Sequence, residues 1–126
     1  MMKFTVPLPP ITKKNHQRIL KNRSTGKPFV APSEQYKSSE AQALWFIPKG
    51  ICIDYPVNVR CLFYMPTRRR CDLTNLLESI DDIMVKAGFL KDDSYSIIVG
   101  HDGSRVLYDK DKPRTEVYIT EIKGEV

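Results

Sequence analysis

The sequence has few cysteines and histidines. Its three cysteines, Cys52, Cys61 and Cys71, are an odd number with wide spacing, and its two histidines, His16 and His101, stand alone. A structural zinc site usually needs four closely spaced Cys or His ligands, and a disulfide framework needs paired cysteines. The sequence therefore argues against both, and it indicates reduced thiols in a cytoplasmic protein.

Membrane-spanning and export signals are also missing. No apolar run approaches the roughly 18 residues that a membrane span needs, and the start lacks the apolar stretch of a signal peptide. A length of 126 residues predicts one domain, 1–126, with a single modest core. Apolar residues make up 41% and charged residues 28%, which is typical of a globular chain. We expect no membrane partner.

Charge is present but unevenly distributed. The net charge is +5, yet the first 33 residues contain no acidic side chain, and Arg68–Arg70 form a second basic run. Residues 72–93 then gather six acids: Asp72, Glu78, Asp81, Asp82, Asp92 and Asp93. One explanation is a solvated helix face and a polar turn. The other is a metal site in a basic surface, as in an enzyme that acts on nucleic acid. The charge pattern leaves both open.

Hydrophobic periodicity predicts an α+β fold, with two main helices packed on a mixed β-sheet. Residues 11–28 are basic and rich in turn signals, which indicates a mobile loop or a loosely held hairpin. Ser33 is a good cap for a first helix that ends near residue 46, and a second helix should cover 73–86. The expected strands are 3–8, 29–31, 57–65, 95–101, 104–109 and 115–122, with a turn at Asp102–Gly103.

The second predicted helix carries much of the acidic cluster. A helix turns by about 100° per residue, so Glu78 and Asp82 share one face. Like charges at this spacing destabilise a helix by a few tenths of a kcal/mol. Lys86 could offset them as an ion pair on a solvated face. Alternatively, Mg²⁺ could offset them, because it prefers carboxylate oxygens, and Asp72 and Asp92–Asp93 could complete its site.

The arginine run and the acids after it resemble a known family. Residues 66–76, Asp82 and residues 86–93 match, in order, the motifs of the RusA family of Holliday junction resolvases, and Pro9–Pro10 and 13–15 add weaker matches. The resemblance covers most of the chain. It implies a homodimeric, Mg²⁺-dependent endonuclease, bacterial or phage-encoded, that cuts four-way DNA junctions on two symmetric strands. Mn²⁺ would be a substitute cation, and no small-molecule cofactor is expected.

The resemblance also implies catalytic, metal-binding carboxylates at Asp72 and Asp93. The family motif reads Asp-Leu-Asp-Asn-Leu, and Thr74 stands where its second aspartate would be; Glu78 replaces a lysine that is important for catalysis. We expect Glu78 to supply the missing catalytic oxygen ligand, with Asp82 behind it as a further metal ligand. The alternative is a module that binds branched DNA without cutting it.

Basic residues are the expected DNA contacts. Contacts from Lys and Arg to backbone phosphates position a duplex without reading its sequence. The expected contact residues are Lys13, Lys14, Asn15, Arg18, Arg68, Arg69 and Arg70. Two further interpretations stay open: a small RNA- or ribosome-associated protein, for which the net charge suffices, and a structural phage protein whose acids only solvate a helix. Neither needs Asp72 or Asp93.

Overall fold

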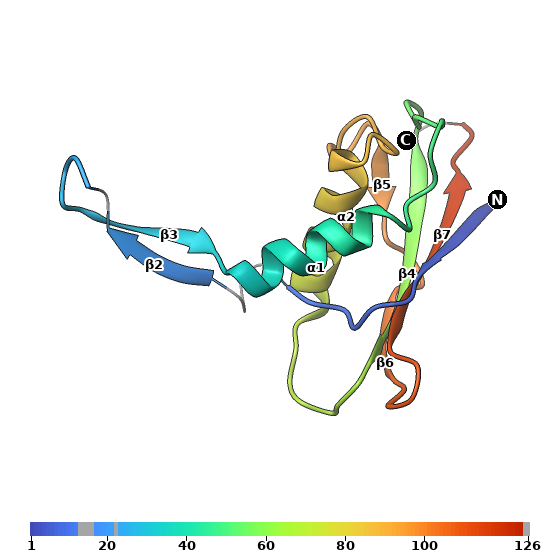
Figure 1. The fold of residues 1–126 in the computed structure, drawn as a ribbon. Helices are drawn as coiled ribbons and strands as arrows, with labels where there is room; N and C mark the ends of the chain where they lie inside the picture. Colours follow the sequence, from blue (N-terminus) through green and yellow to red (C-terminus); the bar gives the residue numbers. More distant parts are fainter. Residues whose placement is uncertain (13–16, 22, 125–126) are drawn as a thin grey trace.

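The protein is a mixed five-stranded β-sheet with two helices and a separate two-stranded hairpin (Figure 1). The computed structural model describes residues 1–12, 17–21 and 23–124. The elements are β1 (Met2–Val6), β2 (Gln17–Lys21), β3 (Pro28–Pro32), α1 (Glu34–Leu44), β4 (Val57–Met65), α2 (Leu73–Lys86), β5 (Ile98–Gly100), β6 (Arg105–Tyr108) and β7 (Arg114–Glu121).

The sheet mixes antiparallel and parallel pairs. Its order is β1-β7-β4-β5, and β6 also pairs with β4. β7 is antiparallel to both β1 and β4, whereas β5 and β6 are both parallel to β4. The predicted α+β class is therefore confirmed. No helix in the described part of the chain is long and apolar enough to cross a membrane.

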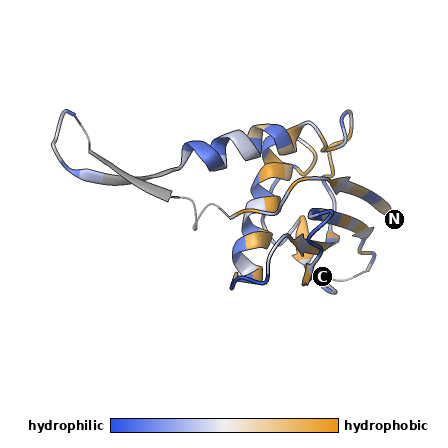
Figure 2. Cartoon of the chain, turned by 60° about the horizontal axis from the view of Figure 1, so that its bottom comes forward, coloured by the Kyte–Doolittle hydropathy of each residue, from blue (hydrophilic) through white to orange (hydrophobic). Residues whose placement is uncertain are grey.

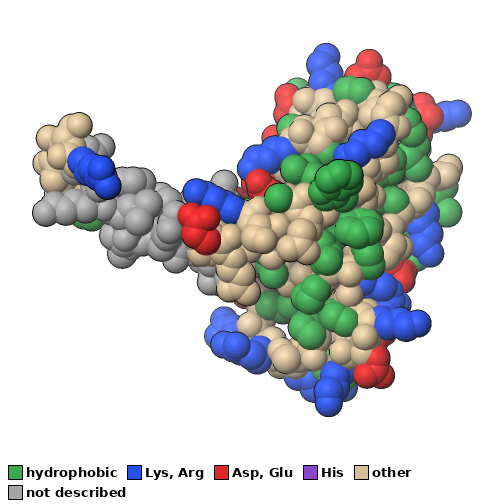
Figure 3. All heavy atoms as spheres, viewed as in Figure 1, with side chains coloured by type: hydrophobic (Ala, Val, Ile, Leu, Met, Phe, Trp, Pro, Cys, Tyr) green, Lys and Arg blue, Asp and Glu red, His purple; other side chains and the backbone are tan. Residues whose placement is uncertain are grey.

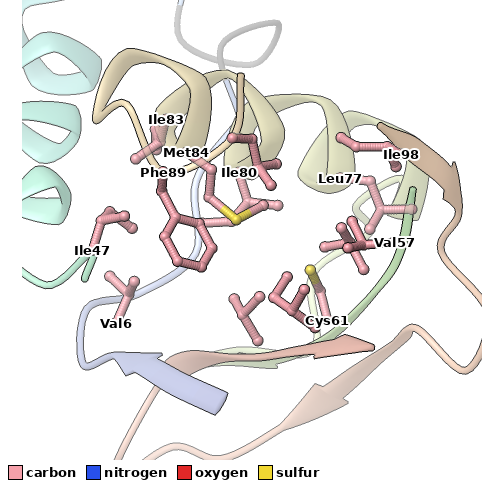
Figure 4. Close-up of a cluster of buried hydrophobic side chains, with 14 of the residues drawn as sticks. Val6, Ile47, Val57, Cys61, Leu77, Ile80, Ile83, Met84, Phe89 and Ile98 are labelled. Carbon is pink, nitrogen blue, oxygen red and sulfur yellow. The ribbon is translucent and has the colours of Figure 1, made fainter. Parts of the chain in front are cut away.

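The core lies between α2 and one face of the sheet. The alternating side chains Val57, Val59, Cys61 and Phe63 of β4 are buried, as the strand periodicity predicts. In α2 the apolar stripe faces them, and Figure 4 shows Ile80, Ile83 and Met84 beside Phe89, across from Val57 and Cys61 of β4. The helix ends before Gly88, whose φ of 77° is the left-handed conformation expected after a C-terminus.

The first helix begins as its sequence predicts. The Ser33 hydroxyl accepts a hydrogen bond from the Tyr36 backbone N–H at 3.1 Å, which satisfies one of the free donors of the first turn. Figure 2 shows that α1 is hydrophilic at its start and more hydrophobic toward its end. Ala43 and Ile47 there join the core. Because α1 contacts α2, it covers one side of that helix.

Part of the basic N-terminal region forms the hairpin. β2 and β3 are antiparallel, in a register from Gln17 opposite Pro32 to Lys21 opposite Pro28. The hairpin extends from the start of α1 away from the sheet (Figure 1). The predicted alternative of a hairpin is thus confirmed within 11–28, and the short strand expected at 29–31 is its second arm. Whether this segment is mobile stays a prediction.

The edge of the sheet beside β4 is interrupted. β5 pairs with the start of β4 and β6 with its end, so the predicted turn at Asp102–Gly103 does not reverse the chain. Gly103 has a φ of 86°, and a Cβ there would lie 2.9 Å from Arg60 Cδ. Only glycine adopts this conformation freely. The chain therefore stops pairing with β4 after β5, makes this turn, and pairs with β4 again in β6.

Two polar side chains fill the interruption. The Asn58 amide donates to the Asp102 carbonyl at 3.1 Å and accepts from the Asp102 N–H at 2.9 Å. The Ser104 hydroxyl accepts from the Cys61 N–H at 3.0 Å. These bonds take the place of the missing backbone pairs, because backbone N–H and C=O groups are strong hydrogen-bonding groups. They also fix the position of His101, which directly follows β5.

Candidate active site

One face of α2 lines a cavity of about 280 Å³. Three segments far apart in the sequence meet there: α2, the loop that follows it, and the end of β5. The lining residues are Thr74, Leu77, Glu78, Asp81, Asp93 and His101. The four α2 residues are spaced i, i+3, i+4 and i+7, so they form one continuous stripe of the helix.

Asp81 is the buried acid of this cavity. The residue is 7% exposed, and its Oδ2 lies 2.8 Å from His101 Nε2. Its Oδ1 is buried and has no hydrogen-bond partner among the described residues. Burial raises the pKa of Asp81, the hydrogen bond and charge of His101 lower it, and the charge of Asp93 raises it further. Asp81 therefore lines the cavity with one of its two oxygens buried and unsatisfied.

The structure brings two of the expected site residues together. Glu78 of α2 and the exposed Asp93 both line the cavity. Thr74 lines it as well, so the position where the resemblance places the second aspartate does face this cavity. Asp92 has a local role instead, because its Oδ1 accepts a hydrogen bond from the Ser94 N–H at 2.8 Å.

Asp72 is exposed just before α2 and is not among the residues that line the cavity. Its Oδ2 accepts a hydrogen bond from the Asn75 side chain at 3.3 Å. It occupies the N-cap position, yet its side chain makes no capping bond to the backbone of α2. The carboxylate is instead turned to a side chain of the first turn.

Asp82 lies about 40° from Glu78 around the axis of α2. It does not line the cavity, and its charge, with that of Glu40 of α1, acts on Tyr36. Burial is the main cause that raises the pKa of Tyr36 to about 12. Lys86 bonds to Glu40 Oε1 at 2.9 Å, so this lysine reaches across to α1. The shared face expected for Glu78 and Asp82 is thus divided between the cavity and α1.

The cavity offers donors suited to a hard cation. Among the residues that the structure describes, no three His, Cys, Asp or Glu side chains form a group able to hold a metal ion. Mg²⁺, however, usually binds through one or two carboxylates, several waters and a substrate phosphate. The carboxylates of the cavity and the unsatisfied Asp81 Oδ1 fit that partial donor set.

A basic groove lies next to the start of α2. Arg68, Arg69 and Arg70 are exposed in the loop between β4 and α2, and a groove of about 550 Å³ separates this loop from residues 9–12. The Arg68 guanidinium lies 4.2 Å from the Tyr108 ring centroid, a cation–π contact that holds it in place. Figure 3 shows several Lys and Arg side chains at the lower end of the molecule, where Figure 1 places the loop between β4 and α2. Residues 13–15 and the side chain of Arg18 lie outside the described part.

Sequence reasoning missed Asp81 and His101. Asp81 interrupts the apolar stripe between Leu77 and Met84, and an acid at a core-side position of an amphipathic helix is a usable signal. His101 gave no signal, because its partner is 20 residues away in sequence. Only the fold brings the two together.

Comparison with known proteins identifies the family. The family model described as Endodeoxyribonuclease RusA matches residues 7–120. The chain belongs to the RusA family. This match includes every residue of the cavity, and it confirms the resemblance seen in the arginine run and the acids that follow.

Relatives named crossover junction endodeoxyribonuclease RusA include proteins from two bacteria and a phage. The chain is 39% identical to the protein from Aquifex aeolicus over 72 residues, which are 55% of this chain and 56% of that one. It is 35% identical to the Escherichia coli K12 protein over 92 residues, 72% of each chain. It is 32% identical to the protein of Enterobacteria phage 82 over 91 residues, again 72% of each chain. The match therefore spans just over half of the Aquifex protein.

Proposed function

We propose that this chain is a divalent-metal-dependent endonuclease that resolves four-way DNA junctions. The observation that carries the proposal is the cavity in which Glu78 and Asp93 converge from two segments, beside the arginine loop. Family membership supports it, since the relatives are named crossover junction endodeoxyribonucleases.

Glu78 and Asp93 would hold Mg²⁺, or Mn²⁺ as a substitute, through carboxylate oxygens, and Asp72 would contribute from the start of α2. Asp82 is left out of this set, because it does not line the cavity and its charge acts on Tyr36 of α1. A bound divalent ion would polarise the scissile phosphate and help to ionise an attacking water. The described lining residues include three acids and no Lys or Arg, so they supply the negative charge that a divalent ion needs.

The arginine loop would hold the DNA backbone beside the cavity. Arg68 is already oriented by Tyr108, and Arg69 and Arg70 line the groove next to the start of α2. Guanidinium groups suit phosphates because they donate two parallel hydrogen bonds. Lys13, Lys14, Asn15 and Arg18 would extend this contact. Binding should weaken steeply with salt, because each neutralised phosphate releases counterions.

A junction needs two cuts related by approximate two-fold symmetry, so a symmetric homodimer suits the task. The cytoplasm would be the place of action for a bacterial or phage-encoded enzyme of this kind. The three cysteines are free thiols, and Cys61 is buried, which is compatible with a reducing compartment.

The test uses a synthetic four-way junction and a linear duplex of the same sequence. We expect Mg²⁺-dependent cutting of the junction by the parent, at least about 100-fold slower cutting by Asp93→Asn, and unchanged junction binding. Asp92→Asn is the matched control, because its Oδ1 can still accept from Ser94 N–H. Cutting that survives EDTA, or parent-like cutting by Asp93→Asn, would reject the metal mechanism.

A non-catalytic branched-DNA-binding module is the second candidate. Its support is that both departures from the family motif, Thr74 and Glu78, line the cavity itself. It predicts tight junction binding without cleavage in either Mg²⁺ or Mn²⁺. The same assay separates the two functions, since binding and cutting are measured on one substrate.

A further inference from the structure

We propose that Asp81 is a metal ligand that replaces the aspartate missing at Thr74, and that His101 is the residue that positions it. The inference rests on the proposed function and names a ligand outside the set that the family resemblance implies. Of the three acids that line the cavity, Asp81 is the one to which the sequence pattern assigned no role.

Asp81 and Thr74 line the same cavity. They lie on the same stripe of α2, seven residues or about 10 Å apart along the helix axis. Asp93 lies near enough to Asp81 for its charge to act on that carboxyl. A carboxylate lost at one end of the stripe is thus matched by a carboxylate gained at the other, on the same cavity.

The two carboxylate oxygens of Asp81 have different surroundings. Oδ2 is bonded to His101, whereas Oδ1 is buried without a partner in the described part of the chain. An unsatisfied buried acceptor costs about 1–3 kcal/mol. A cation between Asp81 and Asp93 would satisfy that oxygen and offset the repulsion between the two carboxylates.

His101 is suited to orient Asp81. Metal-ligating carboxylates are themselves hydrogen-bonded, and such partners fix the orientation of the ligand. His101 meets Asp81 from the interrupted edge of the sheet, where Asn58 and Ser104 hold the turn against β4. The histidine therefore holds one oxygen of Asp81 and leaves the other without a partner among the described residues.

The experiment measures Mn²⁺ binding by titration calorimetry, without DNA. Asp81→Asn keeps the shape of the side chain and should bind Mn²⁺ at least about 10-fold more weakly than the parent. Asp82→Asn, the adjacent residue on the α1 side, should bind like the parent. Equal affinity of Asp81→Asn and the parent would overturn the proposal.

A measurement on the parent itself guards against misfolding of the variant. Mn²⁺ is paramagnetic, and it should broaden the NMR signals of the His101 ring at substoichiometric concentration. His101 signals that stay sharp at a saturating concentration of Mn²⁺ would overturn the proposal, whatever the variant does.

The positioning role has its own test. His101→Gln keeps an N–H donor for Asp81 and should bind Mn²⁺ within about 3-fold of the parent, whereas His101→Leu should lose at least about 10-fold. Equal effects of the two variants would indicate that His101 only fills space, and would reject its positioning role.

Failure of this inference can be told apart from failure of the proposed function. If the parent cuts junctions with Mg²⁺ and Asp81→Asn keeps both cutting and Mn²⁺ affinity, only the inference is wrong. If the parent binds Mn²⁺ through Asp81 and cuts no DNA, the ligand assignment holds and the nuclease proposal fails.

Discussion

Asp81 and Asp82 are neighbours on one helix, yet they lie in opposite surroundings. Asp81 faces the cavity, where His101 holds one of its oxygens and the other is unsatisfied. Asp82 faces α1, where its charge acts on the buried Tyr36. Consecutive helix residues point about 100° apart, so one helix can serve chemistry on one side and packing on the other.

The two sides of α2 also differ in whether their acidic side chains are paired with Lys or Arg. On the α1 side, Lys86 and Glu40 form an ion pair at 2.9 Å. On the cavity side, no Lys or Arg is among the described lining residues, and of the three acids there only Asp81 bonds to the partly buried His101. Carboxylates kept together without a cationic side chain are costly, and this arrangement is typical of a functional site.

The largest effect that we expect on the α1 side appears at alkaline pH. The pKa of Tyr36 is raised from 10.0 to about 12, so the unfolded chain loses this proton first as pH rises. Between pH 9 and 12 the free energy of unfolding of the parent should fall about 2 kcal/mol further than that of Tyr36→Phe. Urea unfolding at several pH values measures this, with the exposed Tyr95→Phe as control. Parallel curves for the parent and Tyr36→Phe would contradict it.

A smaller effect, on Mn²⁺ affinity, is expected on the cavity side. Thr74→Asp, added to Asp81→Asn, returns a carboxylate to the same stripe and should regain about 10-fold in Mn²⁺ affinity over Asp81→Asn alone. Calorimetry measures it, and Thr74→Asn in the same background is the matched control. No recovery would mean that the two positions do not serve one ion.

The smallest effect tests whether the two sides are independent. The Lys86 side chain is 51% exposed, so Lys86→Gln should lower the free energy of unfolding by less than about 1 kcal/mol. Mn²⁺ affinity and junction cutting should not change. A loss of Mn²⁺ affinity in this variant would show that α1 contacts control the cavity.

Local patterns were enough to predict the main elements. Every second residue of β4 from Val57 to Met65 is apolar, and α2 combines an apolar stripe with a glycine at its end, so both elements were predicted with their correct bounds. The hairpin and the edge strands were less certain, because short polar segments carry little periodicity.

The candidate site was predictable only in part. Glu78 and Asp93 were expected in one site, and the structure places both at the cavity. Asp82 was grouped with Glu78 because the two lie 40° apart, but which side α1 covers depends on tertiary packing. The contact between Asp81 and His101 depends on an interruption in the sheet that no local pattern encodes.

That interruption has a second consequence. An intact edge strand exposes a row of free backbone donors and acceptors to which strands of other molecules can add, and this is a route to aggregation. Here the edge consists of pieces of three and four residues, joined by a turn that makes no backbone ladder with β4. The interruption beside His101 therefore also leaves no continuous row of backbone groups to which another chain could add at this edge.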